Sequence, residues 1–323
     1  MKVLITDAEY PDIDDLERPI LEEAGFELEL ARCRTPEQVI QAGRGADALA
    51  VQYAPITRDV LEELPEVRIV SRYGVGVDNI DLEAAQERGI WVANVPDYCM
   101  VEVAVHALAM ALALMRHLPI YDRHVREGRW FYRSTGPLRR PSTMTLGVVG
   151  HGRIGGTIAQ LAVPCFQQVL ACDPYLPESA WPANVQPVDH EALFSRSHVV
   201  TLHVPLNEET RNMVDHRFLS LVPDGGYLVN TSRGGVVNLD DLLQALESGR
   251  LAGAALDVLP QEPPPADHPV LHHPRVLLSP HSAFYSLEAE EELRRKTILN
   301  VVAWAREGRP PYVVVEGRTR PPG

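Results

Sequence analysis

The chain has 323 residues, which is enough for two domains of ordinary size, each with its own core. Hydrophobic residues make up 45% of the sequence and charged residues 23%, which is the mixture of a globular protein and not of a disordered chain. The net charge of −14 comes without a run of Lys and Arg, so a nucleic-acid partner is not expected.

Two features bear on membranes and on the cellular compartment. The first seven residues have too short an apolar run for a secretory signal. Residues 100–118 approach membrane-spanning length but contain Glu102, His106 and Arg116, so they predict a buried helix. The cysteines lack zinc-site spacing and are interpreted as reduced, buried thiols: Cys33, Cys99, Cys165 and Cys172. We therefore expect a cytoplasmic protein with no metal and no membrane partner.

Short apolar runs alternate with amphipathic segments in the first part of the chain. Strands are predicted at residues 3–6, 26–31, 46–52 and 67–72, and helices at residues 14–24 and 58–64. Another helix should begin at Thr35-Pro36-Glu37-Gln38, because Thr35 can cap it and Gln38 can complete a capping box. This alternation implies crossover connections and a parallel sheet.

A second series of elements begins near residue 146. Strands are predicted at residues 146–150, 169–173, 198–204, 227–231 and 252–258, with helices at 189–195 and 241–248. The helix near 100–118 should bridge the two layers, and a helix over about 286–307 should return to the first. The predicted fold class is α/β, with two doubly wound parallel-sheet domains, residues 1–98 plus 285–323 and residues 99–284. A cleft between such domains is the usual place for a ligand.

The most specific motif is Gly150-His151-Gly152-Arg153-Ile154-Gly155, which follows a predicted strand. In this context the glycines allow a tight turn, approach of a pyrophosphate, and close helix–strand packing. The next strand ends at Asp173, near the spacing expected for an acid that bonds the ribose 2′-hydroxyl. A carboxylate there would repel the 2′-phosphate of NADP. The motif predicts an NAD site, although glycines in a simple tight turn are the alternative.

Three later segments each carry one polar residue of a useful kind, and the first two of them follow apolar strands. Arg233 suits a substrate carboxylate because its planar fork donates two hydrogen bonds. His281 suits proton transfer near neutral pH, and Glu262 could orient it. Singly, Arg233 could be a surface arginine, His281 a structural histidine and Glu262 a solvated acid. The interpretation depends on their occurring together after a dinucleotide motif, and it predicts hydride transfer to a 2-keto acid.

Over nearly its whole length the sequence resembles the D-isomer-specific 2-hydroxyacid dehydrogenases. The marks are the Gly150–Gly155 loop, Leu202-His203-Val204-Pro205-Leu206, the segments 230–235 and 257–263, and Pro280-His281. The resemblance implies that Arg233, Glu262 and His281 are catalytic. It also implies a Rossmann NAD-binding domain, a flavodoxin-like substrate domain and a homodimer. The cofactor residues so indicated are Gly150, Gly152, Arg153, Ile154, Gly155, Asp173, His203, Pro205, Thr210, Thr231, Ser232 and Asp257.

In the first domain, residues 73–81 match the family's substrate loop, whose backbone amides hold the carboxylate. Within the family, Arg72, residues 94–99 and residues 281–286 are most similar to the C-terminal-binding-protein group. Arg72 would add a second cation, though it could equally be an arginine at a strand end. Phe284 stands where that group usually has Trp. The implied substrate residues are Arg72, Tyr73, Gly74, Val75, Gly76 and Phe284.

The sequence leaves other functions open. A scaffold or corepressor whose oligomeric state responds to NAD(H) would keep the same polar residues. Oxidation of phosphite on the same fold also fits, whereas a formate enzyme would pair the histidine with Gln instead of Glu262. The main expectation is an NAD(H)-dependent oxidoreductase that interconverts a 2-keto acid and a D-2-hydroxy acid.

Overall fold

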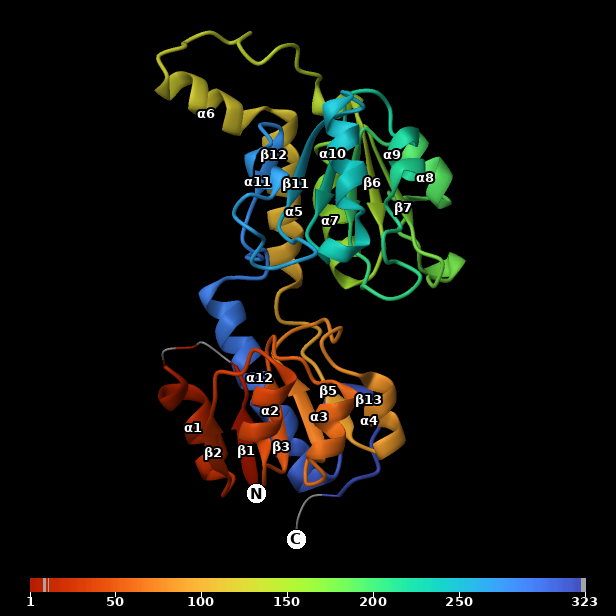
Figure 1. Ribbon diagram of the computed structural model, residues 1–323. Helices are drawn as coiled ribbons and strands as arrows, with labels where there is room; N and C mark the ends of the chain where they lie inside the picture. The colour runs from red at the N-terminus through yellow and green to blue at the C-terminus, as the bar shows by residue number, and fades with distance from the viewer. Residues whose placement is uncertain (8–9, 11, 321–323) are drawn as a thin grey trace. The chain divides into compact units, whose positions relative to one another are not determined.

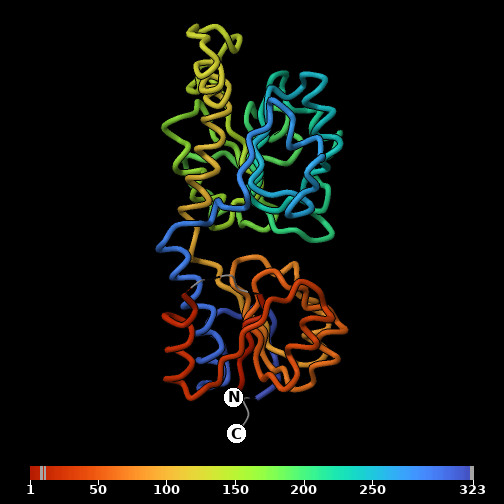
Figure 2. The backbone as a smooth tube through the Cα atoms, turned by 60° about the vertical axis from the view of Figure 1, so that its left-hand side comes forward, coloured from red at the N-terminus to blue at the C-terminus, as the bar shows by residue number. Residues whose placement is uncertain are grey.

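The computed structural model describes residues 1–7, 10 and 12–320, and the chain divides into two compact units (Figure 1). Unit 1 comprises residues 1–98 and 286–323, and unit 2 comprises residues 99–285. Because the chain leaves unit 1 and later returns to it, the C-terminal segment, blue in Figure 2, lies beside the red and orange N-terminal segments.

Unit 1 is built on a six-stranded sheet in the order β13-β5-β4-β3-β1-β2. Strands β1 to β5 are parallel in a flavodoxin-like order, and β13 pairs antiparallel with β5. The expected capping box is present, since Gln38 N–H donates to Thr35 Oγ1 and the Gln38 side chain accepts from Thr35 N–H. The elements are β1 (Lys2–Ile5), α1 (Ile13–Glu23), β2 (Glu27–Leu30), α2 (Pro36–Gly43), β3 (Ala48–Val51), α3 (Arg58–Glu63), β4 (Ile69–Arg72), α4 (Leu82–Arg88), β5 (Trp91–Ala93), α12 (Leu287–Glu307) and β13 (Val313–Val315).

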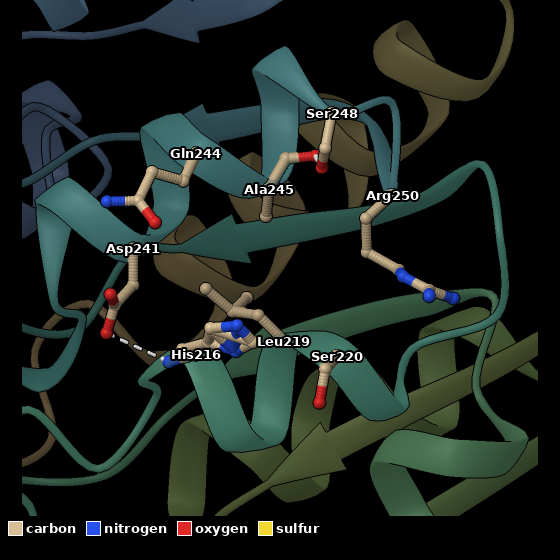
Figure 3. A pocket seen from close by; sticks show the side chains of 8 residues that line it. All are labelled: His216, Leu219, Ser220, Asp241, Gln244, Ala245, Ser248 and Arg250. Carbon is tan, nitrogen blue, oxygen red and sulfur yellow. Dashed lines mark hydrogen bonds between the residues drawn. The ribbon is translucent and has the colours of Figure 1, made fainter.

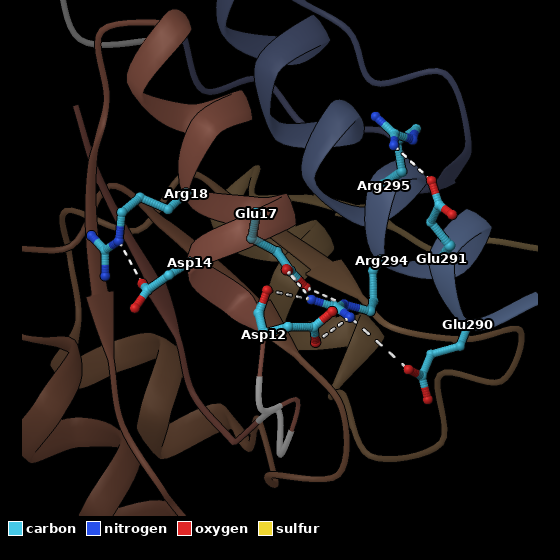
Figure 4. A network of polar contacts seen from close by, with 8 residues as sticks. All are labelled: Asp12, Asp14, Glu17, Arg18, Glu290, Glu291, Arg294 and Arg295. Carbon is cyan, nitrogen blue, oxygen red and sulfur yellow. Dashed lines mark hydrogen bonds and ion pairs between the residues drawn. The ribbon is translucent and has the colours of Figure 1, made fainter. Parts of the chain in front are cut away.

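A buried ion pair joins the two chain segments of unit 1 (Figure 4). Arg294 of α12 donates from Nε and Nη2 to the two carboxylate oxygens of Glu17 in α1, at 2.9 and 2.7 Å. Arg294 also donates to Asp12, and its guanidinium lies 4.5 Å from the ring centroid of Tyr10. The Glu17 side chain is 0% exposed and that of Arg294 3%, so each charge depends on the other for compensation.

Unit 2 has a seven-stranded parallel sheet in the order β12-β11-β10-β9-β6-β7-β8. This is a Rossmann-type arrangement with helices on both faces, so the predicted fold class is confirmed. The elements are α5 (Met100–Met115), α6 (Leu118–Arg126), η1 (Pro141–Thr143), β6 (Thr145–Val149), α7 (Arg153–Ala162), β7 (Gln168–Cys172), η2 (Glu178–Ala180), β8 (Gln186–Pro187), α8 (His190–Arg196), β9 (Val199–Leu202), α9 (His216–Leu221), β10 (Gly226–Asn230), η3 (Gly234–Val236), α10 (Leu239–Glu247), β11 (Leu251–Leu256), α11 (Pro269–His272) and β12 (Val276–Leu278).

The prediction of one helix over residues 100–118 is wrong at its C-terminal end. Helix α5 ends at Met115, and His117 adopts a left-handed conformation (φ 51°) before α6 begins. The Nε2 atom of His117 lies 3.3 Å from the hydroxyl of Tyr227, which helps to hold this bend. In the described part of the chain no single helix is long and apolar enough to cross a membrane. Helices α5 and α6 together have the length and composition of a membrane-spanning segment, but they meet at a bend of 58°.

The cysteines are all free thiols, but their burial differs from the prediction at one position. Cys33, Cys99 and Cys172 are buried, whereas Cys165 is only partly covered. Cys165 comes just after α7, where the chain turns toward β7, and a side chain at such a turn is partly open to solvent.

Candidate functional site

The polar residues predicted in unit 2 follow the C-terminal ends of its strands. The chain enters the sheet at β6 and proceeds outward to β8, then returns to β9 on the other side of β6. Ligands of doubly wound sheets bind outside the carboxyl ends of the strands, near such a reversal. Arg233, Glu262 and His281 follow β10, β11 and β12, which are neighbours in the sheet.

Two glycines of the loop before α7, Gly150 and Gly155, are required by the packing of the protein itself. Gly150 has a φ of 86°, and a Cβ there would lie 2.6 Å from the carbonyl oxygen of His203. A Cβ on Gly155 would lie 1.8 Å from the Gly150 carbonyl oxygen, so the helix can approach the strand only with glycine. At Gly152, in contrast, no atom lies within 4 Å of the position that a Cβ would take. Gly152 is therefore exposed to open space at the N-terminus of α7, where a pyrophosphate is favoured.

Other predicted cofactor residues surround this loop. Asp173 accepts hydrogen bonds from the backbone N–H groups of His151 and Tyr175, at 2.9 and 3.0 Å, so its carboxylate stands at the end of β7 in a fixed orientation. His203 Nε2 lies 2.9 Å from Thr201 Oγ1, and burial lowers the pKa of His203 to about 3. Its imidazole is thus neutral near pH 7.

The remaining predicted cofactor residues lie in the same unit. Thr231 is buried, and its hydroxyl has no hydrogen-bond partner within the described residues. Thr210 Oγ1 donates to the Pro205 carbonyl at 2.6 Å and so closes the loop after β9. Arg153 and Ile154 form the first turn of α7. The open space at Gly152, the orphaned Thr231 hydroxyl and the acid at the end of β7 fit a bound dinucleotide.

The predicted histidine–carboxylate pair is formed. His281 Nδ1 lies 2.6 Å from Glu262 Oε2, and the other carboxylate oxygen accepts from the Leu259 N–H at 2.8 Å. A carboxylate only accepts hydrogen bonds, so the Nδ1 atom of His281 carries the proton in this contact. The Nε2 atom is then left as the site that can give or take a proton. The Phe284 ring lies edge-on to the imidazole, with 6.3 Å between centroids.

Arg233 is held by a loop whose conformation depends on Asn230. The Asn230 side chain donates to the Arg233 carbonyl at 2.9 Å and accepts from the N–H and the hydroxyl of Ser232. A Cβ on Gly234 would lie 2.0 Å from the carbonyl carbon of Leu259, so this loop packs directly on the segment that carries Glu262. Sequence reasoning identified the segment but not the role of Asn230; a buried amide at the end of a strand is the signal that could have found it.

Asp257, predicted beside the cofactor, directs its carboxylate to the segment that carries His281. Its oxygens accept from the Ser279 hydroxyl and from the N–H groups of Ser282 and Ala283, at 2.5, 2.9 and 3.0 Å. The Asp257 side chain is 1% exposed, so these donors compensate a buried acid. These bonds connect the end of β11 to the segment after β12.

In unit 1, the predicted substrate loop follows β4. The Gly74 N–H donates to the Arg72 carbonyl at 2.9 Å, whereas the amides of Val75 and Gly76 have no hydrogen-bond partner among the described residues. A Cβ on Gly74 would lie 1.4 Å from an Arg72 guanidinium nitrogen, so the Arg72 side chain folds over this glycine. The Tyr73 side chain is buried against Tyr10, with ring centroids 5.8 Å apart, and so its backbone, not its ring, belongs to the loop surface.

A surface groove of about 270 Å³ lies elsewhere in unit 2, between α9 and α10 (Figure 3). Polar side chains and apolar surface both line it, and Leu219 and Ala245 are its buried residues. None of the predicted site residues lines it. Its lining residues are His216, Leu219, Ser220, Asp241, Gln244, Ala245, Ser248 and Arg250.

A Rossmann-type sheet with this glycine loop and a histidine–carboxylate pair defines a dinucleotide-dependent oxidoreductase. Residues 108–283 match the family model described as the NAD-binding domain of D-isomer specific 2-hydroxyacid dehydrogenases. The chain belongs to this family. It is therefore an NAD-dependent enzyme that interconverts 2-keto and D-2-hydroxy acids, as predicted.

Individual relatives agree with this assignment. The chain is 38% identical over 316 residues to a glyoxylate reductase of Korarchaeum cryptofilum, a match that covers 93% of this chain and 94% of the relative. It is 36% identical over 294 residues to a D-3-phosphoglycerate dehydrogenase of Methanocaldococcus jannaschii, a match that covers 90% of this chain but 55% of that protein.

Among solved structures, that of an Aquifex aeolicus D-lactate dehydrogenase complexed with NAD and lactic acid has a TM-score of 0.87 at 28% identity and covers 98% and 100% of the two chains. These comparisons do not favour the scaffold or the phosphite-oxidising alternative.

Proposed function

We propose that the protein reduces a small 2-keto acid of the glyoxylate type, with His281, Glu262 and Arg233 as its catalytic residues. The observation that carries the catalytic assignment is the 2.6 Å contact between His281 Nδ1 and Glu262 Oε2. The substrate class is supported by the glyoxylate reductase that is 38% identical to this chain. The similarity of Arg72 and residues 94–99 to the C-terminal-binding-protein group stays a prediction.

In this proposal His281 is the general acid of the reduction. When NADH is bound, it supplies the hydride that reaches the carbonyl carbon of the substrate. The carbonyl oxygen becomes an alkoxide, and His281 Nε2–H gives it a proton. Glu262 keeps the proton on Nδ1 and compensates the imidazolium that donates, so that the ring holds one orientation throughout the reaction.

The substrate carboxylate needs donors that fix its plane. Arg233 offers a planar fork that can bind a carboxylate or a carbonyl through two hydrogen bonds. The free amides of Val75 and Gly76 are the second set of donors in the proposal, as the family resemblance implies. The role of Arg72 is to add positive charge beside these amides.

The test is NADH oxidation, followed by absorbance, against 2-keto acids of graded size. We expect the highest turnover with glyoxylate or a three-carbon acid. His281→Ala should lower kcat by about 10²- to 10⁴-fold, because general acid catalysis contributes that much. His216→Ala, at the groove between α9 and α10, is the matched control and should keep the wild-type rate. An equally active His281→Ala enzyme would show that another group delivers the proton.

We also propose that the protein is a cytosolic homodimer that associates through α6 and the segment after it. Figure 1 shows this part reaching beyond the α/β body of unit 2. It exposes several apolar side chains, which is unusual for a surface that meets only water: Leu118, Val125, Trp130, Phe131 and Tyr132. Free thiols at all four cysteines suit a reducing compartment. Sedimentation of a Trp130→Glu, Phe131→Glu variant should give a monomer, and an unchanged dimer would place the interface elsewhere.

A further inference from the structure

A chain of polar contacts leads from helix α5 to the segment that carries His281. The Nε2 atom of His106 lies 2.9 Å from the Ser279 hydroxyl, which lies 2.5 Å from Asp257 Oδ1. His106 Nε2 itself is 3.8 Å from the same carboxylate oxygen. All residues in this series of contacts belong to unit 2, although His106 and Ser279 are 173 positions apart in the sequence.

The segment that this contact chain reaches is strained. His281 has a φ of 53°, a left-handed conformation that a side chain other than glycine adopts at some cost. Such a conformation persists only where the surroundings determine it. Here the Asp257 carbonyl accepts from the His281 N–H at 2.7 Å, while the Asp257 carboxylate holds Ser279 on one side and Ser282 and Ala283 on the other.

The hydrogen atoms in the contact chain can be assigned from chemistry alone. A carboxylate cannot donate, so the single hydroxyl proton of Ser279 points to Asp257. The serine oxygen can then only accept from His106, whose Nε2 must carry a proton. His106 thus fixes the rotation of the hydroxyl, and the hydroxyl completes the set of donors around Asp257. Without it, one oxygen of a side chain that is 1% exposed would lose its closest donor.

We propose that His106 and Ser279 are positioning residues for the reduction: through Asp257 they hold the His281 backbone in the conformation that directs its imidazole to Glu262 and the substrate. The inference rests on the proposed function, because it assumes that His281 delivers the proton. Neither residue touches the reacting atoms in this assignment. A displacement of the imidazole by about 1 Å is enough to slow the proton transfer by two orders of magnitude.

The test compares two matched pairs of variants in the full-length protein. Ser279→Ala removes the hydroxyl and Ser279→Thr keeps it. His106→Leu removes the donor, while His106→Gln places an amide N–H close to where Nε2–H was. Each variant is assayed for kcat, KM, NADH affinity, melting temperature and the effect of D₂O on kcat with the best 2-keto acid.

We expect Ser279→Ala and His106→Leu to lower kcat by about 10- to 100-fold and to raise the solvent isotope effect, because proton delivery becomes slower. Their NADH affinity should fall much less than kcat, since the glycine loop predicted to bind the pyrophosphate is untouched. Ser279→Thr and His106→Gln should recover most of kcat. Recovery by the conservative variant separates positioning from a loss of packing alone.

Two results would overturn the inference. One is a wild-type kcat in both Ser279→Ala and His106→Leu. The other is equal impairment within each pair together with a matching fall in melting temperature, which would mean a purely structural role. His281→Ala measured alongside distinguishes this failure from failure of the proposed function: if His281→Ala is inactive while the other variants are normal, only the positioning role is lost.

Discussion

Replacing Gly152 with Ala should affect cofactor binding without affecting folding, because no contact within the protein requires a glycine at this position. Its φ and ψ of −71° and −157° are open to alanine, and no atom lies within 4 Å of the added Cβ. A change from Gly to Ala at a compatible position stabilises a protein by about 0.4–1 kcal/mol. We therefore expect the melting temperature of Gly152→Ala to equal or slightly exceed that of wild type.

The same methyl group should weaken NADH binding. It would occupy the space through which a pyrophosphate reaches the amides at the start of α7. Loss of one hydrogen bond to a charged group costs about 1.5–3 kcal/mol, which corresponds to about a 10- to 100-fold higher Kd. NADH fluorescence titration measures the Kd, and differential scanning fluorimetry measures stability.

Gly225→Ala is the reciprocal control. A Cβ at Gly225 would also meet open space, but the φ of this residue is 76°. An alanine in this left-handed conformation costs about 1–2 kcal/mol. It lies in the turn before β10, and the variant should lose stability while its NADH affinity is retained. If Gly152→Ala bound NADH as tightly as wild type, the pyrophosphate would not pass over Gly152, and the reasoning from open space would fail.

Three other substitutions each remove one named interaction. Asp173→Ser should raise the ratio of NADPH to NADH activity about tenfold or more, because a charge that repels the 2′-phosphate is gone; an unchanged ratio moves the discriminating contact elsewhere. Arg233→Lys keeps the charge but not the fork, so KM for the keto acid should rise about tenfold with NADH affinity unchanged; an unaltered KM would remove Arg233 from the substrate site. Arg294→Met leaves the fully buried Glu17 carboxylate without its cation, so the free energy of unfolding measured in urea should fall by about 3–5 kcal/mol. The double variant Arg294→Met, Glu17→Leu should regain much of this free energy.

The sequence predicted those features that depend on local order. The alternation of strands and helices predicted two parallel sheets and most of their strands, but not β5, β8, β12 or β13. The spacing of Gly150, Gly152 and Gly155 predicted the turn that the structure shows at the start of α7, and the cofactor roles of these residues and of Asp173 stay a prediction. These are short-range patterns, set by hydrophobic periodicity and backbone conformation within about thirty residues. The pair of Glu262 and His281 was predicted from chemistry and family resemblance, and the structure brings the two side chains within hydrogen-bond distance.

Features that depend on contacts between residues far apart in the sequence could not be predicted. The apolar pattern of α5 gives no sign that it ends at Met115, because the left-handed turn at His117 is held by a tyrosine more than a hundred positions away. The orientation of the Asp257 carboxylate depends on Ser279 and on two amides beyond it, and His106 approaches Ser279 only once α5 has packed on the sheet. A three-residue edge strand such as β13 is too short to stand out from a loop.

The discontinuous architecture of unit 1 determines the order in which the polypeptide can mature during translation. Helix α12 packs against α1 and β4, and its Asn300 and Thr297 hydrogen-bond to Asn94 and Ser71, so the first 98 residues leave the ribosome without their covering helix. Synthesis from residue 98 to the end of α12 takes on the order of 10 to 40 s at ordinary elongation rates. Unit 2 is continuous and can fold in that interval, whereas the part of the protein that is made first is finished last. A nascent chain stalled inside α12 should therefore expose an incomplete N-terminal sheet to chaperones and proteases while its dinucleotide-binding unit is already resistant.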